Sequence, residues 1–159
     1  YKGIDQVKVG NRIGDTGFTV QQYVEREHKY GVVRDLVGHG LGRDLHEAPQ
    51  VPNFGKRGRG VKLQEGLVIA IEPMVNQGTK TVRMVRDGWT VFAKDRKLAA
   101  HYEHSVALRK DGVDILSNHV LITDVIAKNP NIKEVELYDT ALTAPYLEVQ
   151  KKAAMQKAS

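Results

Sequence analysis

Residues 67–74, which read Leu67-Val68-Ile69-Ala70-Ile71-Glu72-Pro73-Met74, decide the fold. The apolar run is short and ends at a proline, which predicts a buried strand. Glu72 stands at the end of this strand, where a carboxylate is costly to bury unless it is paired or binds a metal. Two interpretations of Glu72 therefore remain open: a metal ligand, or a strand end that surfaces into water.

Upstream of this strand, the chain predicts one helix, one strand and a long loop. Apolar residues at helical spacing indicate an amphipathic helix over residues 11–30, with Gly31 as a left-handed cap. Residues 32–37 are typical of a strand, which ends in the glycine-rich turn 38–42. Residues 46–60 contain several prolines and glycines and indicate a loop.

Downstream, the pattern changes from strands to helices. Asp87-Gly88 predicts a hairpin between short flanking strands. Further strands are expected over residues 101–108 and 113–116, and the remaining elements are helical. These are a short helix through residues 121–126, a turn at 129–131 and a terminal helix from about residue 143. A helix, then strands, then helices is the order of an α+β domain.

Length and composition limit the class of protein. The 159 residues, 41% hydrophobic and 27% charged, suit one globular domain. The chain has no cysteine, which excludes disulfides, thiolate nucleophiles and cysteine zinc sites. No apolar run reaches the ~20 residues of a membrane span, and no secretory leader is recognisable. We therefore expect a cytoplasmic protein without a membrane partner.

Histidines and carboxylates are the candidates for chemistry. His39 lies between two glycines, which let backbone and ligand approach closely. Glu103 shares a polar strand face with His101, and that face borders either a site or solvent. With His46 and Glu72 these residues provide imidazole and carboxylate donors, which suit Mn, Fe(II), Co or Zn. A turn histidine or a solvated sheet face are the alternatives that the residues leave open.

Other enzyme classes do not fit the motifs. His46-Glu47-Ala48-Pro49-Gln50 is not a zinc-protease helix, because its fifth residue is Gln50 and Pro49 breaks the helix. The chain has no G-x-S-x-G nucleophile elbow. The glycines around His39 also lack the dinucleotide spacing.

Five blocks of the chain carry a family resemblance. They are Gly38-His39-Gly40-Leu41-Gly42, His46-Glu47-Ala48-Pro49, Ile71-Glu72-Pro73-Met74, Asp87-Gly88-Trp89-Thr90 and Tyr102-Glu103-His104-Ser105. In this order and spacing they resemble type I methionine aminopeptidase, rather than X-Pro peptidases or creatinase. The resemblance implies a pita-bread fold of which only the C-terminal half is clearly represented. It also implies that residues 1–117 are part of the catalytic domain and residues 118–159 an extension of unknown role.

The resemblance implies two divalent metal ions, of a metal (Co, Mn, Fe(II) or Zn) that the sequence does not decide. His39 and Glu72 would hold one ion, and Glu103 would bridge both. The family also uses two aspartates and a further histidine that nothing before Gly38 supplies. We therefore expect an N-terminal half, or another chain, to complete the site.

The resemblance also assigns the substrate side of the site. His46 would hydrogen-bond the substrate near the scissile peptide and help stabilise the tetrahedral intermediate. Trp89 would form a wall of the methionine pocket. Leu45 stands where a phenylalanine is expected in that wall, and His101 stands where glutamine is more usual.

The activity implied is removal of the initiator methionine from nascent proteins, through attack of a metal-bound hydroxide on the first peptide carbonyl. An alternative is a non-catalytic pita-bread module, or an inactive fragment, that recognises chain termini or the ribosome. A general RNA-binding α+β domain is a third hypothesis. It depends on the basic loop Lys56, Arg57, Arg59 and Lys62, which either contacts ribosomal RNA or is simply solvated.

Overall fold

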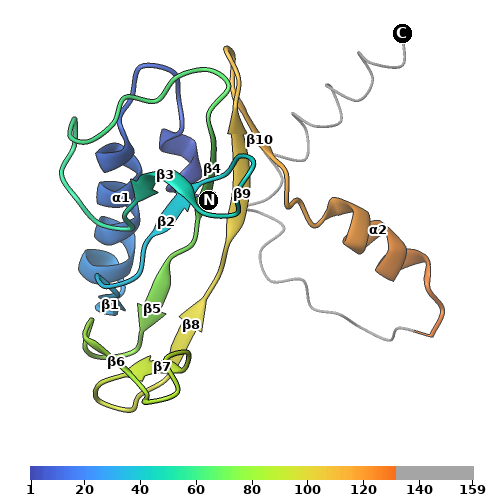
Figure 1. The fold of residues 1–159 in the computed structure, drawn as a ribbon. Helices are drawn as coiled ribbons and strands as arrows, with labels where there is room; N and C mark the ends of the chain where they lie inside the picture. The colour runs from blue at the N-terminus through green and yellow to red at the C-terminus, as the bar shows by residue number, and fades with distance from the viewer. Residues whose placement is uncertain (132–159) are drawn as a thin grey trace, which may run out of the picture.

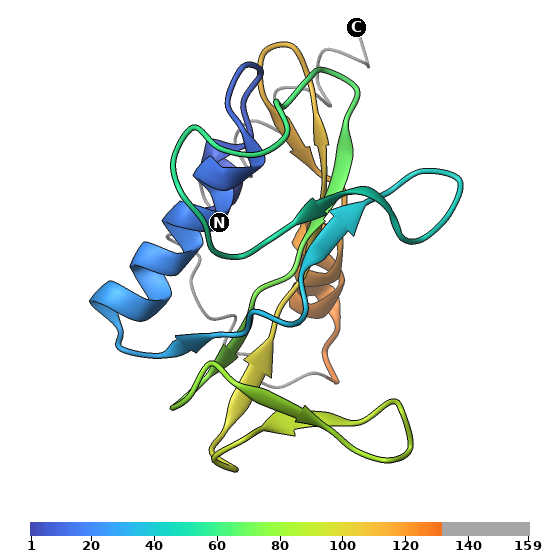
Figure 2. The same ribbon diagram turned by 60° about the vertical axis from the view of Figure 1, so that its left-hand side comes forward.

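The computed structural model describes residues 1–131, and in these residues strands lie between two helices (Figures 1 and 2). The helical elements are η1 (Ile4–Gln6), α1 (Ile13–Gln21), its π-helical continuation η2 (Gln22–Glu27), and α2 (Val120–Lys128). The strands are β1 (Gly31–Val32), β2 (Gly38–Gly40), β3 (Glu47–Val51), β4 (Val68–Ile71), β5 (Met74–Asn76), β6 (Val82–Met84), β7 (Val91–Ala93), β8 (Ala99–His101), β9 (His104–Leu108) and β10 (Val113–Ile115).

The strands form two sheets and a separate hairpin. One sheet has the order β10-β9-β4-β2-β3, the other has the order β1-β5-β8, and β6 pairs with β7 alone. All the pairings are antiparallel. Figure 1 shows α1 on one side of the long strands and α2 on the other side, beyond β9 and β10.

The two sheets are joined by one pair of strands that runs through both. β4 continues into β5 and β8 continues into β9, with Ile71 opposite His104 in one sheet and Met74 opposite His101 in the other. Both pairings keep the same register. Between them, where neither strand is assigned to a sheet, Glu72 therefore lies opposite Glu103. Pro73 lacks an N–H and interrupts the ladder there. Across this gap, the Tyr102 N–H donates to the Pro73 carbonyl at 3.4 Å.

The core has two parts, one for each sheet. The larger cluster packs η1 and the start of α1 against the five-stranded sheet, through residues that include Ile13, Ile69 and Val106. The smaller one joins the later turns of α1 and η2 to β1, through Val20, Val24 and Val32. The helix over residues 13–27 is therefore held along its length against both sheets.

Several predicted elements are confirmed. The helix after residue 11, the buried strand that includes residues 68–71 and the hairpin around Asp87-Gly88 are present. The final strand, the short helix near residues 121–126 and the turn at 130–131 are also present. These elements are consistent with the α+β class. The helix expected from about residue 143 lies outside the described residues.

Five local predictions were wrong. The strand expected over residues 32–37 is reduced to the two residues of β1, and residues 34–35 form a bend. Residues 38–40 form strand β2 rather than a turn, and β3 lies inside the predicted loop 46–60. The strand expected over residues 101–108 is divided into β8 and β9, because Pro73 lies across from the break. Gly31 is not the left-handed cap, since Lys29 has the positive φ of 61°.

Of the helices in residues 1–131, none is long and apolar enough to cross a membrane.

Candidate metal centre

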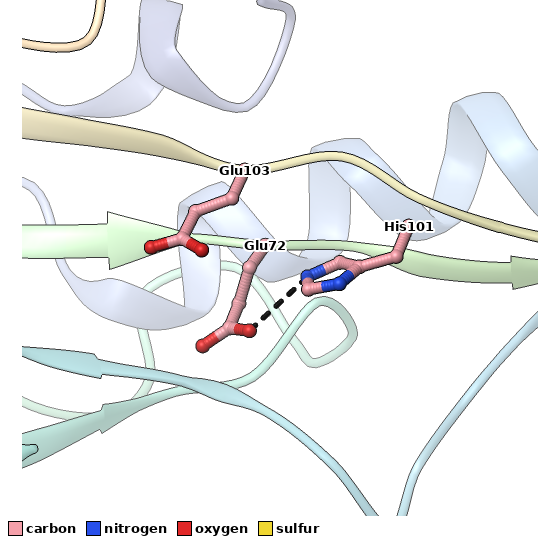
Figure 3. A group of neighbouring side chains, drawn as sticks. All are labelled: Glu72, His101 and Glu103. Carbon is pink, nitrogen blue, oxygen red and sulfur yellow. Dashed lines mark ion pairs between the residues drawn. The ribbon is translucent and has the colours of Figure 1, made fainter. Parts of the chain in front are cut away.

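Two carboxylates face each other where the two sheets meet. Glu72 leaves β4 and Glu103 precedes β9, and the shared register sets them directly opposite on the same face (Figure 3). Like charges at opposed positions of neighbouring strands destabilise a sheet. Glu103 is exposed, whereas the Glu72 side chain is only 13% exposed, so water screens this repulsion in part. A cation held between the two carboxylates would offset it.

His39 approaches Glu72 from the neighbouring strand β2. Its Nδ1 lies 3.0 Å from the Gly40 carbonyl oxygen, which can only accept, so Nδ1 carries the hydrogen. This leaves Nε2 directed at Glu72 Oε1, at 3.3 Å. A Cβ at Gly40 would collide with the Ala48 carbonyl, so glycine lets β2 and β3 approach closely here. The orientation is that of an imidazole whose second nitrogen is free to bind a metal.

His101 approaches the same carboxylate from the other side. It is the last residue of β8, and its Nε2 lies 3.2 Å from Glu72 Oε2 (Figure 3). Glu72, His101 and Glu103 each offer one ligand atom, and the three atoms lie within 4.8 Å of one another. The sequence analysis placed His101 on the polar strand face of Glu103 and noted that glutamine is more usual at this position, but it gave His101 no role in the site.

The donor set fits a divalent metal ion of the transition series. Carboxylate oxygens and imidazole nitrogens bind Mn, Fe(II), Co and Zn, whereas softer ions prefer thiolates, which this chain lacks. Carboxylates set opposite each other, with imidazoles on both sides of one of them, are poorly explained by packing alone. The residues therefore support the divalent metal that the sequence predicted, without fixing its identity or number.

A cleft opens beside these residues. Its volume is about 580 Å³, and its lining includes His39, His46, Glu72, His101 and Trp89. The His46 and His39 rings are in edge contact, with centroids 4.3 Å apart. The remaining lining is mostly aliphatic and aromatic, contributed by residues near β1 and by β5 to β8. The cleft thus combines polar groups at one part of its wall with an apolar remainder.

The two predicted pocket residues lie in different surroundings. Trp89 follows the turn of the β6–β7 hairpin, where its backbone N–H donates to Asp87 Oδ1 at 2.9 Å. Its side chain lines the cleft, and the residue is 89% exposed. Leu45 is 70% exposed and is not among the cleft-lining residues of the described chain. Its place in the methionine pocket therefore stays a prediction.

A buried asparagine supports Glu72 from behind. Asn53 is 1% exposed, and its Nδ2 donates to the Glu72 carbonyl oxygen at 3.2 Å. This bond satisfies a carbonyl at the point where the ladder is interrupted. The sequence analysis missed Asn53, because nothing in the loop pattern indicates which asparagine becomes buried.

On the opposite sheet face, His104 is buried behind the carboxylates. Its Nδ1 is 2.9 Å from Ser117 Oγ, and the Tyr102 ring contacts it edge-on. Burial is the main cause that lowers the pKa of His104 to about 4. His104 is therefore neutral at physiological pH, and its side chain packs on the sheet face that points away from the two carboxylates.

The side chains of the basic loop are exposed, but its backbone is hydrogen-bonded to the start of α1. The Ile13 and Gly14 N–H groups at the start of α1 donate to the Val61 and Arg59 carbonyls, at 3.0 and 2.9 Å. The Arg57 guanidinium lies 4.7 Å from the centre of the Phe18 ring. The loop thus satisfies the free N–H groups of the helix start, while its side chains remain accessible to a partner.

Comparisons with known proteins agree with this description. Methionine aminopeptidase from Clostridium perfringens is 54% identical over 117 residues, which cover 74% of this chain and 47% of that protein. Methionine aminopeptidase 1 from Bacillus subtilis is 47% identical, with the same coverage. The crystal structure of methionine aminopeptidase from Rickettsia prowazekii superposes with a TM-score of 0.72 at 42% identity, over 74% of this chain and 47% of that one.

The chain spans about half the length of the curated relatives it matches. The fold is accordingly part of the pita-bread fold of this family. The profile described as metallopeptidase family M24 matches residues 1–124, which is well over half of the chain. The chain belongs to metallopeptidase family M24.

Proposed function

We propose that this chain forms part of a metalloaminopeptidase that removes the initiator methionine from new proteins. The observation that carries the proposal is the opposed pair Glu72 and Glu103, with His39 beside it. Of these residues, Glu72 and His39 line the polar part of an otherwise apolar cleft. The curated relatives at 54% and 47% identity are named methionine aminopeptidases. Because the chain spans about half of their length, the activity of the whole protein is inferred.

In this proposal His39, Glu72 and Glu103 hold two divalent ions, with Glu103 between them. The ions would polarise the peptide carbonyl and make water acidic enough to act near neutral pH. Glu72 or Glu103 would carry a proton toward the leaving amine. The other donors would come from polypeptide outside residues 1–131, in an N-terminal half or another chain.

The lining of the cleft supports a proposal for the substrate contacts. His46 would donate a hydrogen bond to the carbonyl oxygen of the scissile peptide, which gains negative charge during attack. Its ring contact with His39 supports this role, because that contact holds His46 beside the proposed ions. Trp89 and the apolar lining would receive the methionine side chain, and a contact of Leu45 with that side chain is proposed from the family resemblance alone. An unbranched thioether adapts well to an irregular apolar wall.

The test begins with the polypeptide isolated from its natural source. Its intact mass, compared with 17.7 kDa, and its metal content are measured first. Methionine release from the peptide Met-Ala-Ser is then followed by mass spectrometry. We expect release, and a loss of at least 100-fold in the Glu103→Gln variant. A metal-loaded protein that binds this peptide without cleaving it would instead support a non-catalytic module.

We further propose that the basic loop contacts ribosomal RNA, which would place the enzyme in the cytoplasm beside its substrates. Lys56, Arg57, Arg59 and Lys62 are exposed on a loop whose backbone is fixed to α1. Phosphate contacts of this kind weaken steeply with salt.

Co-sedimentation with ribosomes at increasing salt tests this contact. Changing Lys56, Arg57 and Arg59 to Ala should abolish salt-sensitive binding. A matched triple change of Lys80, Arg83 and Arg86, which are exposed on or near the β6–β7 hairpin, should leave it intact. Equal binding by both triple variants would exclude the loop as the contact.

A further inference from the structure

We propose that His101 is itself a metal ligand, which gives this centre a second imidazole beside that of His39. The inference rests on the proposed function to the extent that the latter places metal at Glu72 and Glu103. The second imidazole makes the centre richer in nitrogen, and so favours Zn²⁺ and Co²⁺ over Mn²⁺.

The position of His101 in the ladder brings it to the metal side of the sheet. It lies two residues before Glu103, so the two side chains share a face, and its pairing with Met74 sets it diagonally across from Glu72. Figure 3 shows the three side chains converging from the neighbouring strands. Backbone pairing fixes this position of His101, independently of the conformation of its exposed side chain.

The distances suit a shared ion. His101 Nε2 and Glu72 Oε2 are 3.2 Å apart. Two ligand atoms bound at ~2.1 Å to one tetrahedral ion lie roughly 3.4 Å from each other. All three candidate atoms of Glu72, His101 and Glu103 lie within 4.8 Å of one another. Small side-chain rotations would therefore bring the three around one ion.

The proton arrangement of His101 is also compatible with ligation. In residues 1–131 the structure shows no hydrogen bond to its Nδ1, which is free to carry the ring proton toward water. The Nε2 lone pair then points to Glu72. The opposing interpretation is a plain ion pair, which needs the proton on Nε2. At 49% side-chain exposure such a pair would contribute little to stability.

Glu72 therefore lies between two imidazoles, His39 on Oε1 and His101 on Oε2. A carboxylate contacted through both oxygens by nitrogen donors can orient each of them toward an ion on the Glu103 side. The described residues alone then supply one nitrogen and two carboxylates whose ligand atoms lie close together, from His101, Glu72 and Glu103. His39 adds a second nitrogen beside the other oxygen of Glu72. We expect the 159-residue chain to bind one Co²⁺ or Zn²⁺ without further donors.

The experiment titrates the metal-free full chain with Co²⁺, followed by visible absorption, and then with Zn²⁺ and Mn²⁺ in competition. The test variants are His101→Gln and His101→Ala. Glu72→Gln is the control for loss of the centre, and His28→Gln is the matched control at an exposed histidine. Circular dichroism verifies that each variant is folded. X-ray absorption of the Zn²⁺ form counts imidazole ligands.

Support requires that both His101 variants bind Co²⁺ at least ~10-fold more weakly, with an altered spectrum and one fewer imidazole on Zn²⁺. Their preference for Zn²⁺ over Mn²⁺ should also fall, while His28→Gln stays unchanged. Unchanged affinity and spectrum in the His101 variants, together with loss of binding in Glu72→Gln, would overturn the proposal and leave the proposed function standing. Equal metal binding by the wild type and the Glu72→Gln variant would contradict both this proposal and the proposed function.

Discussion

The opposed carboxylates Glu72 and Glu103 lower the stability of the folded chain in the absence of metal. Two carboxylates directly opposite each other repel, and residues that serve function at the expense of stability are typical of active sites. The Glu103→Gln variant should therefore stabilise the metal-free chain by about 0.5–1 kcal/mol. It should also lose the stabilisation that Co²⁺ or Zn²⁺ gives to the wild type.

Urea unfolding with and without metal measures both effects. Glu65→Gln, a change at an exposed glutamate of the loop before β4, is the control and should alter neither value. A Glu103→Gln variant that is less stable than the wild type in the absence of metal would show that the two carboxylates do not repel each other in the folded chain.

Asn53 is the second residue with a measurable effect. Its side chain is buried, and its Nδ2 donates to the Glu72 carbonyl. In the Asn53→Ala variant this carbonyl loses its donor and a small cavity forms, so we expect a loss of about 1–3 kcal/mol in the free energy of unfolding. Metal affinity should fall as well, because Glu72 is held less firmly.

Denaturant unfolding and Co²⁺ titration report these two losses. Gln64→Ala provides a matched control, since it removes an exposed amide near the same sheet. An Asn53→Ala variant with wild-type stability and metal affinity would show that the bond to Glu72 supports neither.

Among the elements, α1 and the loop after β3 depend on one aspartate. Asp15 Oδ2 accepts from the Arg12 N–H and Oδ1 from the Gly58 N–H, both at 2.8 Å. The backbone donors of Gly58 and Arg12 lower the pKa of Asp15 below its ordinary value of 3.8. Ionised Asp15 thus joins the start of the helix to the basic loop.

Because this pKa is lowered in the folded state, the stabilisation is fully present above the unfolded pKa, near 4, and is lost as the pH falls through the folded pKa. The Asp15→Asn variant should be less stable by about 1 kcal/mol at pH 7, a typical capping contribution. The difference should shrink at pH 3 and below.

Thermal unfolding at several pH values follows this difference. Asp35→Asn serves as the control, because Asp35 is exposed and residues 1–131 show no side-chain partner for it. A difference between wild type and Asp15→Asn that is constant from pH 7 to pH 2 would contradict the assignment.

The sequence predicts those elements whose own residues determine them. The apolar run before Glu72 and the Asp87-Gly88 turn indicate their structure locally. β2 could not be predicted in this way, since Gly38 and Gly40 resemble a turn. Carbonyls from residues distant in sequence occupy the space of their missing side chains. The break between β8 and β9 has its cause in Pro73, on the partner strand.

The same division holds for the site. The pattern around His39, Glu72 and Glu103 indicates the chemistry, and the structure brings these residues together. His101 and Asn53 owe their places beside Glu72 to pairings that only the folded chain makes. The polar strand face that His101 shares with Glu103 does not by itself distinguish a site from a solvated surface, and a loop asparagine is common in any protein.

At the scale of the molecule, the described part carries large exposed apolar side chains. Leu98 is 77% exposed beside a groove of about 390 Å³ that also includes Tyr30 and Val75. β8 is the edge strand of its sheet there. Such an edge with exposed apolar surface favours association. We therefore expect the purified 159-residue chain to form oligomers at micromolar concentrations.

Sizing chromatography with light scattering tests this expectation. The Leu98→Ser variant should shift the population toward monomer. Leu45→Ser, a change at an equally exposed leucine away from the groove, should not. A monodisperse wild-type monomer would refute the expectation.

The uninterrupted register from β4 through β5 also determines where this protein can change length. Segment 77–98 connects β5 to β8 and lies outside the pairing of these two strands. Residues added or removed within it therefore leave the pairing of Ile71 with His104 unchanged. One residue inserted between Val68 and Asn76 would instead turn every later side chain of that strand to the opposite face. Evolution or design can therefore reshape the β6–β7 wall of the cleft freely, while the spacing of the donors stays fixed by the backbone.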